Sequence, residues 1–305
     1  MAFGTLPASA YLCAMLVLDG KIASKSVIDS LKTEVDALKA QGKRAPHLAA
    51  VLVGNNGASE TYVASKVKHC EEIGFGSTLI RLADTVTEAE LIATIDELNK
   101  NEDIDGILVQ LPLPKHIDEQ KIIMAIDPAK DVDGFHPVSV GKLVQGLQTF
   151  IPATPYGIML MLEYFNISTK GKHAVVIGRS NIVGRPMSIL LSSNNAFGNC
   201  TVTVCHSHTP NLKETCLQGD IIVAALGRPE FVKADMVKDG AIIIDVGITR
   251  VEDSTAKRGY RIKGDVAYNE VAEKASAITP VPGGVGLMTI AGLMKNTLQA
   301  YKEKL

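Results

Sequence analysis

The sequence of 305 residues contains no tryptophan, and aromatic residues make up only 5% of it. Few rings are therefore available to stack on planar ligands, so a tyrosine in a candidate site, such as Tyr62, is more informative than usual. Neither sign of charge predominates, since the formal net charge is −2 at pH 7. Because the chain lacks the excess of positive charge typical of nucleic-acid-binding proteins, we expect no nucleic-acid partner.

Cysteine pairs with the spacing of a disulfide framework or a zinc site are also missing. The cysteines number five, namely Cys13, Cys70, Cys200, Cys205 and Cys216. No two of them have C-x-x-C spacing, and an odd number without a secretory signal predicts reduced thiols in the cytoplasm. Cys205, His206 and His208 lack the wider spacing and the second ligand pair that zinc sites need, so we predict no metal.

Long hydrophobic runs are absent as well. The apolar run Ala8–Leu18 is short for a membrane span, and no basic region precedes it. We expect it to be an extension that leads into the first core segment, and we expect no membrane association. Hydrophobic residues at 46% and charged residues at 21% are typical of a globular protein. A chain of this length predicts two domains, each with its own core.

What the sequence does contain is a strand–glycine–helix segment. The β-branched run His173–Ile177 predicts a buried strand, and a helical pattern follows from Met187. Between them, Gly178 and Gly184 allow the backbone to approach an anion at a helix N-terminus, as in phosphate-binding turns. The match to G-x-G-x-x-G is incomplete because Ser180 replaces the second glycine. The same glycines also fit an ordinary β-to-α turn. Whether this turn binds phosphate must therefore be judged from the neighbouring segments.

The residues after the next predicted strand, Thr201–Cys205, favour NADP over NAD. In NAD sites an acidic residue at the end of this strand binds the ribose 2′-hydroxyl. Here His206–Thr209 follows the strand and contains Ser207 but no acid, so a 2′-phosphate would not be repelled. Arg179 adds a cation whose planar donor fork matches phosphate. The sequence therefore predicts NADP as the cofactor.

Alternating strand and helix patterns divide the chain into two units near the proline-rich segment Phe150–Pro155. In the first unit we expect strands at 47–53, 77–82 and 104–111 and helices at 22–38, 59–73 and 88–101, with Ser59 as one N-cap and Thr87 in a capping box. In the second unit we expect strands near 174, 202, 221 and 241, a hairpin from 249 to 263 and a final helix at 289–304. Such alternation predicts parallel sheets covered by helices.

Four residues of chemical interest lie in the first unit. Tyr62 and Lys66 are four positions apart in a predicted helix and therefore share one face. In an arbitrary helix, this pair is more often a half-buried tyrosine beside a solvated lysine. Gln110 and Asp133 also fit purely structural roles, as a strand-end residue and a turn residue, and we assign no role to His136. Only their combination with other motifs favours a functional site.

Five motifs occur in one order along the chain: Tyr62–Lys66, Val109–Pro114, Asp131–Phe135, Gly178–Pro186 and Pro280–Gly286. This order closely resembles the bifunctional methylenetetrahydrofolate dehydrogenase/cyclohydrolase family, from about Leu18 to the last helix. The resemblance implies a two-domain α/β fold. Residues 1–153 plus 287–305 would form a catalytic folate-binding domain closed by the C-terminal helix, and residues 154–286 a Rossmann-like NADP-binding domain. It also implies a cytoplasmic homodimer that binds a folate substrate between the domains.

The resemblance further implies the reactions and the residue roles. 5,10-Methylenetetrahydrofolate would be oxidised with NADP, and the 5,10-methenyl product hydrolysed to 10-formyltetrahydrofolate. The implied catalytic residues are Lys66, Gln110 and Asp133. The implied substrate-binding residues are these three together with Tyr62, Val109, Leu111, Pro282, Gly283, Gly284, Val285 and Gly286. The implied cofactor-binding residues are Gly178, Arg179, Ser180, Ser207 and Ile248.

Some positions depart from the family pattern, and two other functions remain open. Leu287 stands where proline commonly follows Gly-Val-Gly, and the segment Asn195–Cys200 is longer than the usual connection. A shikimate-type NADP dehydrogenase with a Lys/Asp pair has a related two-domain plan, but it explains neither Tyr62 nor the Pro282–Gly284 segment. A non-enzymatic NADP sensor is also possible, because fold alone does not prove catalysis.

Overall fold

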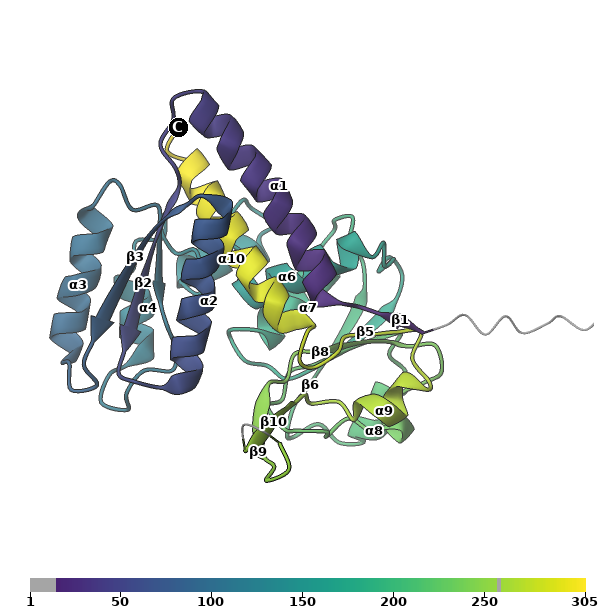
Figure 1. Ribbon diagram of the computed structural model, residues 1–305. Helices are drawn as coiled ribbons and strands as arrows, with labels where there is room; N and C mark the ends of the chain where they lie inside the picture. Colours follow the sequence, from purple (N-terminus) through teal and green to yellow (C-terminus); the bar gives the residue numbers. More distant parts are fainter. Residues whose placement is uncertain (1–14, 257–258) are drawn as a thin grey trace, which may run out of the picture.

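The computed structural model describes residues 15–256 and 259–305. Cys13 and the expected N-terminal extension up to residue 14 therefore lie outside the described part. The chain forms two lobes, each built on its own parallel sheet, and three helices lie between them (Figure 1). These helices are α1 (Gly20–Ala40), α6 (Ala153–Tyr164) and α10 (Val285–Lys302).

The smaller lobe contains a three-stranded sheet in the order β3–β2–β4. Its strands are β2 (His47–Val53), β3 (Gly76–Leu82) and β4 (Gly106–Val109), and its helices are α2 (Gly57–Ile73), α3 (Glu88–Lys100) and α4 (Glu119–Ala125). Helix α5 (Pro137–Val144) also lies between the lobes, since Ser139 bonds Asp131 and Leu143 joins the core of the larger lobe. All strand pairs are parallel. The predicted strand at 104–111 is shorter in the structure. The Gln110 N–H still donates to the Val51 carbonyl at 2.9 Å, but Pro112 has no N–H with which to continue the ladder.

The two predicted helix caps in this lobe have different outcomes. The capping box is confirmed, since Thr87 Oγ1 accepts from the Glu90 N–H and the Glu90 carboxylate accepts from the Thr87 N–H. Ser59 as an N-cap is wrong, because α2 already begins at Gly57. The Ser59 N–H donates instead to the side-chain oxygen of Asn56 at 3.2 Å. The asparagine three residues earlier supplies the acceptor, so the helix starts one half-turn sooner than expected.

The larger lobe contains a six-stranded sheet in the order β1–β11–β8–β7–β5–β6. Its strands are β1 (Leu16–Val17), β5 (His173–Ile177), β6 (Thr201–Cys205), β7 (Ile221–Ala224), β8 (Ile242–Asp245) and β11 (Ala277–Ile278), and they are all parallel. The helical segments are α7 (Gly184–Ser192), α8 (Leu212–Cys216), η1 (Ala234–Met236) and α9 (Tyr268–Ala272). The predicted hairpin is confirmed as β9 (Thr249–Glu252) with β10 (Tyr260–Lys263). Although β1 precedes the first lobe in sequence, it pairs with β11 of this sheet.

Helices α6 and α10 pack closely because each has a glycine at the contact. A Cβ built on Gly157 would lie 2.4 Å from the Met288 carbonyl oxygen, and one on Gly292 would lie 2.5 Å from that of Ala153. From the sequence, the proline-rich segment where α6 begins was expected to be only a boundary between two units. Pro155 lies in the first turn of this helix, where proline is tolerated. Side chains of α10 also join the core of the smaller sheet, so the C-terminal helix closes that lobe, as predicted.

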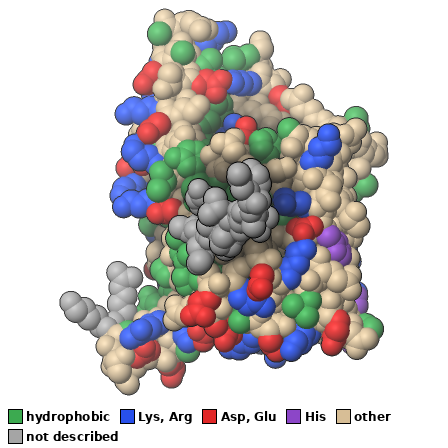
Figure 2. Space-filling view, turned by 90° about the vertical axis from the view of Figure 1, so that its right-hand side faces the viewer, with side chains coloured by type: hydrophobic (Ala, Val, Ile, Leu, Met, Phe, Trp, Pro, Cys, Tyr) green, Lys and Arg blue, Asp and Glu red, His purple; other side chains and the backbone are tan. Residues whose placement is uncertain are grey.

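The surface carries charge of both signs. On the face shown in Figure 2, acidic and basic side chains are interspersed, and neither covers a continuous area. Within residues 15–256 and 259–305, no helix has the length and apolar character needed to cross a bilayer.

Candidate functional site

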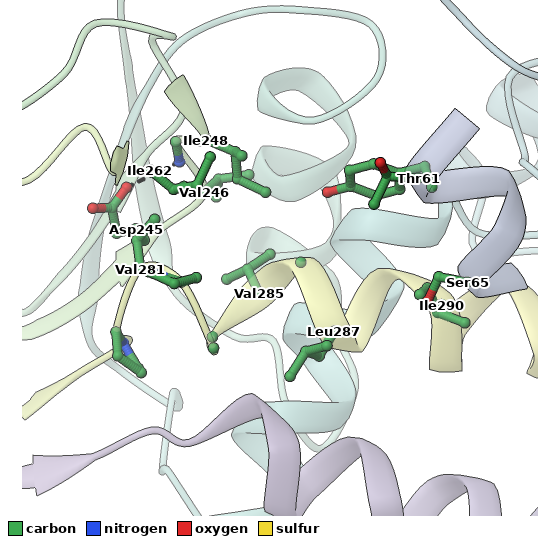
Figure 3. A pocket seen from close by; sticks show the side chains of 17 residues that line it. Thr61, Ser65, Asp245, Val246, Ile248, Ile262, Val281, Val285, Leu287 and Ile290 are labelled. Atoms are coloured by element: carbon green, nitrogen blue, oxygen red, sulfur yellow. Dashed lines mark hydrogen bonds between the residues drawn. The ribbon is translucent and has the colours of Figure 1, made fainter. Parts of the chain in front are cut away.

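An apolar cavity of about 320 Å³ lies between the two lobes. Helix α2 contributes Thr61, Tyr62 and Ser65 to it, and the segment from Asp245 to Ile248 contributes the opposite wall. In Figure 3, Ile248 lies on one side and Thr61 on the other, with the first turn of α10 below them. Burial raises the pKa of the Tyr62 hydroxyl, so this group stays a neutral donor.

The floor of the cavity is the segment Pro280–Leu287. The predicted loop ends earlier than expected, because Val285 and Gly286 form the first turn of α10. This helix was predicted to begin at Thr289, and its packing on α6 extends it by four residues. A Cβ on Gly286 would lie 3.1 Å from Ile248 Cδ1 and 3.5 Å from the Tyr62 hydroxyl oxygen. Glycine at this position therefore keeps open the space between the two walls.

Lys66 lies one helical turn after Tyr62 and is only 6% exposed. Its Nζ donates a hydrogen bond to Gln110 Oε1 at 3.0 Å. The amide of Gln110 is itself fixed, because Nε2 donates to the Leu111 carbonyl at 2.7 Å. Burial lowers the pKa of the Lys66 ammonium, and the charge of Asp133 partly opposes this effect. The structure thus provides an amine held in place by one side chain and biased towards its neutral form.

Asp133 lies in a loop that a second carboxylate organises. Burial raises the pKa of Asp133 to about 6, while the charge of Lys66 lowers it and that of Asp131 raises it further. Asp131 is 1% exposed and accepts hydrogen bonds from the backbone N–H of His136 at 2.9 Å and from Ser139 Oγ at 2.7 Å. His136, to which no role was assigned, is the N-cap of α5. Asp131 lies in one of the five sequence motifs, but nothing in that motif predicted its role in organising this loop.

The expected substrate-binding residues fall into two groups in the structure. Tyr62 and the five residues from Pro282 to Gly286 line the large cavity. Val109, Leu111 and Asp133 line a separate space of only about 10 Å³ beside β4. Lys66 and Gln110 line neither space. Their hydrogen bond joins the helix of Tyr62 to the segment that contains Val109 and Leu111. Ser65, which lines the large cavity, immediately precedes Lys66 in α2.

The glycine turn after β5 is built as a close backbone contact. Gly178 has φ 129°, and a Cβ there would lie 2.2 Å from the Ala225 carbonyl oxygen. A Cβ on Gly184 would lie 2.2 Å from the Gly178 carbonyl oxygen. The hydroxyl of Ser180 accepts from the N–H groups of Val183 and Gly184 at 3.2 and 3.3 Å. Neither glycine can be replaced without moving the turn, and α7 begins directly from it.

Arg179 and Ser207 are both exposed at the same edge of the sheet. Strands β5 and β6 are neighbours, and the Gly178 N–H donates to the Cys205 carbonyl at 2.9 Å. The residues after these strands therefore lie at one edge, where ligands bind in open parallel sheets. His206 Nδ1 accepts from the His208 N–H at 3.2 Å, so this ring shapes the turn that follows β6.

Sequence reasoning missed several residues of the cavity wall. Thr61, Ser65, Asp245 and Ile262 line it but were not predicted. Asp245 had a usable signal, since it ends a buried strand at the carboxyl edge of a parallel sheet. Thr61, Ser65 and Ile262 had no such signal in the sequence, because their place in the wall depends on how the two lobes meet.

The larger sheet and its glycine turn define a nucleotide-binding domain of the Rossmann type, joined to a second α/β domain that presents a buried lysine. Comparison with family models agrees. Residues 18–133 match the tetrahydrofolate dehydrogenase/cyclohydrolase catalytic domain, and residues 152–305 match the NAD(P)-binding domain of the same family. The chain belongs to the tetrahydrofolate dehydrogenase/cyclohydrolase family. The resemblance found in the sequence, the fold class and a bifunctional dehydrogenase/cyclohydrolase with an NAD(P)-binding domain are thereby confirmed.

Individual relatives are similar over nearly their whole length. The bifunctional protein FolD of Cytophaga hutchinsonii is 61% identical over 290 residues, which cover 95% of this chain and 100% of that protein. The crystal structure of the FolD dehydrogenase/cyclohydrolase from Campylobacter jejuni is 47% identical, with a TM-score of 0.89, and covers 96% of this chain and 100% of its own. The Trypanosoma brucei FolD structure, a complex with NADP cofactor and inhibitor, is 38% identical with a TM-score of 0.90 and covers 95% of this chain and 98% of its own.

Proposed function

We propose that the protein oxidises 5,10-methylenetetrahydrofolate with NADP and then hydrolyses the 5,10-methenyl product to 10-formyltetrahydrofolate. The observation that supports this most directly is the buried Lys66, held by Gln110 at 3.0 Å and one turn away from the cavity-lining Tyr62. An arrangement of this kind supplies both a planar binding surface and a group able to accept and return a proton.

The cofactor edge fits a dinucleotide phosphate. The turn between Gly178 and Gly184 is a close backbone contact that leads directly into the N-terminus of α7, and the dipole of this helix favours an anion there. Arg179 and Ser207 are proposed to bind the 2′-phosphate, because both are exposed at this edge and His206–Thr209 contains no acid. Ser180 and Ile248 complete the proposed contacts. When bound, NADP accepts the hydride, and these residues align it with the substrate.

The substrate's ring system is proposed to lie in the 320 Å³ cavity. Tyr62 would stack on its aromatic part, and the floor from Pro282 to Gly286 would support the pterin. Val109, Leu111 and Asp133 would bind the pterin edge, with Asp133 accepting from the exocyclic nitrogens. These last three residues line the small space beside β4, so substrate binding requires that it open towards the main cavity.

Lys66 is proposed to perform the proton transfers of hydrolysis. The methenyl carbon is electrophilic, and water attacks it more readily when a neutral amine takes the water proton. The resulting ammonium then donates a proton to the departing ring nitrogen, which completes ring opening. A lysine does both only if its pKa lies well below its ordinary value, which is the direction that burial imposes here. Gln110 positions Lys66 through its side-chain oxygen.

The proposal includes the organisation of the chain. Residues 1–153 plus 287–305 form the catalytic domain, except that Leu16–Val17 pair with β11, and residues 154–286 form the cofactor domain. Support comes from α10, whose side chains share a core with β2 and β4. A homodimer and a cytoplasmic location remain part of the proposal. The location is supported by the four described cysteines, which are all free thiols.

One assay tests the proposed function. Purified protein is mixed with 5,10-methylenetetrahydrofolate and NADP, and NADPH formation is followed by absorbance. Methenyltetrahydrofolate is then added without cofactor, and its decay is recorded. We expect both activities, and the absence of both would refute the proposal. A dehydrogenase active on shikimate but not on folate would favour the alternative considered from the sequence.

A further inference from the structure

Two buried carboxylates beside the cavity have no part in the chemistry proposed above. Asp245 ends β8 and is 3% exposed, and Asp265 follows β10 and is 0% exposed. Within the described residues, neither forms a salt bridge, and the hydrogen-bond donors to both are backbone N–H groups. Carboxylates buried without a cation are costly, so their partners indicate what they hold in place.

Asp245 joins the two ends of the β9–β10 hairpin. Its Oδ1 accepts from the N–H groups of Gly247 at 2.9 Å and Asp265 at 2.8 Å. Its Oδ2 accepts from the Val266 N–H at 3.0 Å. Gly247 immediately precedes Ile248, which lines the cavity. The entry and exit of the hairpin are therefore fixed to the end of β8, and with them the position of Ile248.

Asp265 extends this connection to the next strand of the sheet. Its Oδ2 accepts from the N–H groups of Leu226 at 2.6 Å and Gly227 at 2.9 Å, which follow β7. The adjoining Ala225 is the residue whose carbonyl oxygen contacts Gly178. A continuous path of contacts thus runs from the glycine turn after β5, through the loop after β7, to the hairpin that carries Ile248.

The fit around both carboxylates is tight. A Cβ on Gly247 would lie 2.4 Å from Asp265 Oδ1, and one on Gly264 would lie 1.9 Å from Asp245 Oδ2. Asp265 Oδ1 is buried and has no hydrogen-bond partner. Only Oδ2 therefore holds the loop after β7, and loss of this one oxygen releases both N–H groups.

We propose that Asp265 is a positioning residue that holds the loop after β7 on the hairpin anchored by Asp245, and thereby aligns this loop for cofactor binding in the dehydrogenase reaction. The inference rests on the proposed function, because it assigns the cofactor to this edge. The hydrolytic residues are held separately: Lys66 is bonded to Gln110, which follows β4 of the smaller sheet. Loss of the Asp265 contacts therefore affects cofactor binding and oxidation, and leaves hydrolysis of methenyltetrahydrofolate intact.

The test compares Asp265→Ala and Asp265→Asn. For Asp265→Ala we expect the Kd for NADP by calorimetry and the KM for NADP to rise about tenfold, since two N–H groups lose their acceptor. Cofactor-independent hydrolysis should change less than about twofold. Asp265→Asn keeps an oxygen able to accept from both N–H groups but loses the charge. The Kd and the KM for NADP should rise only about threefold in this variant, because a charged carboxylate accepts hydrogen bonds more strongly than a neutral amide oxygen.

Asp220 offers a matched control in the same sheet. It precedes β7, at the opposite end from Leu226, and accepts from the His173 N–H at 2.7 Å and from Lys238 Nζ at 2.5 Å. Asp220→Ala also removes an acceptor of a backbone N–H group, yet it should leave the NADP constants unchanged. This control separates general destabilisation of the domain, which both variants would cause, from displacement of the loop after β7, which only Asp265→Ala would cause.

Three results would overturn the positioning role. They are unchanged NADP constants in Asp265→Ala, a parallel loss of both activities, or an equal rise of the constants in Asp220→Ala. Should Asp265→Ala not fold, Asp265→Asn decides, since an unchanged Kd for NADP in that variant contradicts the inference. A wild-type protein that binds NADP but lacks both folate activities would refute the proposed function instead, and the Kd comparison would still test Asp265.

Discussion

Lys66 Nζ lies 3.0 Å from Gln110 Oε1, although the two residues are 44 positions apart in the sequence. The bond joins α2 to the end of β4 and holds a buried amine one helical turn from the cavity-lining Tyr62. Because Gln110 is neutral, it orients the ammonium without providing the negative charge that would raise its pKa. The pair combines a fixed position with a depressed pKa, and the first two predictions depend on it.

Lys66→Met should abolish the cyclohydrolase activity. Methionine preserves the apolar stem of lysine but cannot exchange a proton, so we expect a loss of at least about hundredfold in the rate of methenyltetrahydrofolate decay. Lys68→Met is the matched control, because Lys68 is exposed on the same helix and should be replaceable without effect. Full hydrolysis by the Lys66 variant would exclude this lysine as the proton-transfer group, and a non-enzymatic cofactor sensor would tolerate its loss.

Gln110→Glu should move the pH dependence of hydrolysis upwards. A carboxylate in contact with Lys66 stabilises the ammonium and raises its pKa, so less neutral amine is present at pH 7. We expect the acid limb of the rate profile to shift by about one pH unit and the rate at pH 7 to fall about tenfold. The profile is measured on methenyltetrahydrofolate without cofactor. An unshifted acid limb would mean that Lys66 does not set it.

Asp133→Asn should remove a pH dependence of folate binding. The pKa of Asp133 is raised to about 6, chiefly by burial, so the carboxylate is ionised above this pH and protonated below it. If the ionised form accepts from the pterin nitrogens, the wild-type KM for methylenetetrahydrofolate should rise as the pH falls below about 6. In the Asn variant, KM should be higher throughout and nearly independent of pH.

Asp127→Asn is the control for this titration, because Asp127 is exposed and precedes the same loop. It should reproduce the wild-type pH profile of KM. A pH-dependent KM that persists in Asp133→Asn would assign the titration to another group, of which Asp131 is the nearest candidate, since its pKa is also raised to about 6 by burial.

Arg179→Ala should weaken NADP binding far more than NAD binding. The guanidinium is proposed to contact the 2′-phosphate, which NAD lacks, so KM for NADP should rise about tenfold while KM for NAD changes less than about twofold. Arg185→Ala is the control, since Arg185 lies further along in α7, where it binds the Asn181 side chain at 3.0 Å. Equal effects of Arg179→Ala on both cofactors would remove this residue from the phosphate site.

Local patterns in the sequence were sufficient for most of the secondary structure. Strand β2 has the predicted bounds, the capping box at Thr87 is present, and the hairpin from Thr249 to Lys263 forms as expected. These features depend on neighbouring residues, through alternation, capping and turn chemistry. The error at Ser59 had a local cause too, because Asn56 was an equally good cap three residues earlier.

The tertiary structure decided what depends on contacts between distant segments. The pairing of β1 with β11, the early start of α10 at Val285 and the hold of Asp265 on Leu226 join parts of the chain that no local pattern relates. The sequence identified Lys66 and Tyr62 as neighbours on a helix face. Only the folded chain buries that lysine against Gln110, and burial is what changes its chemistry, because the cost of a charge depends on its surroundings.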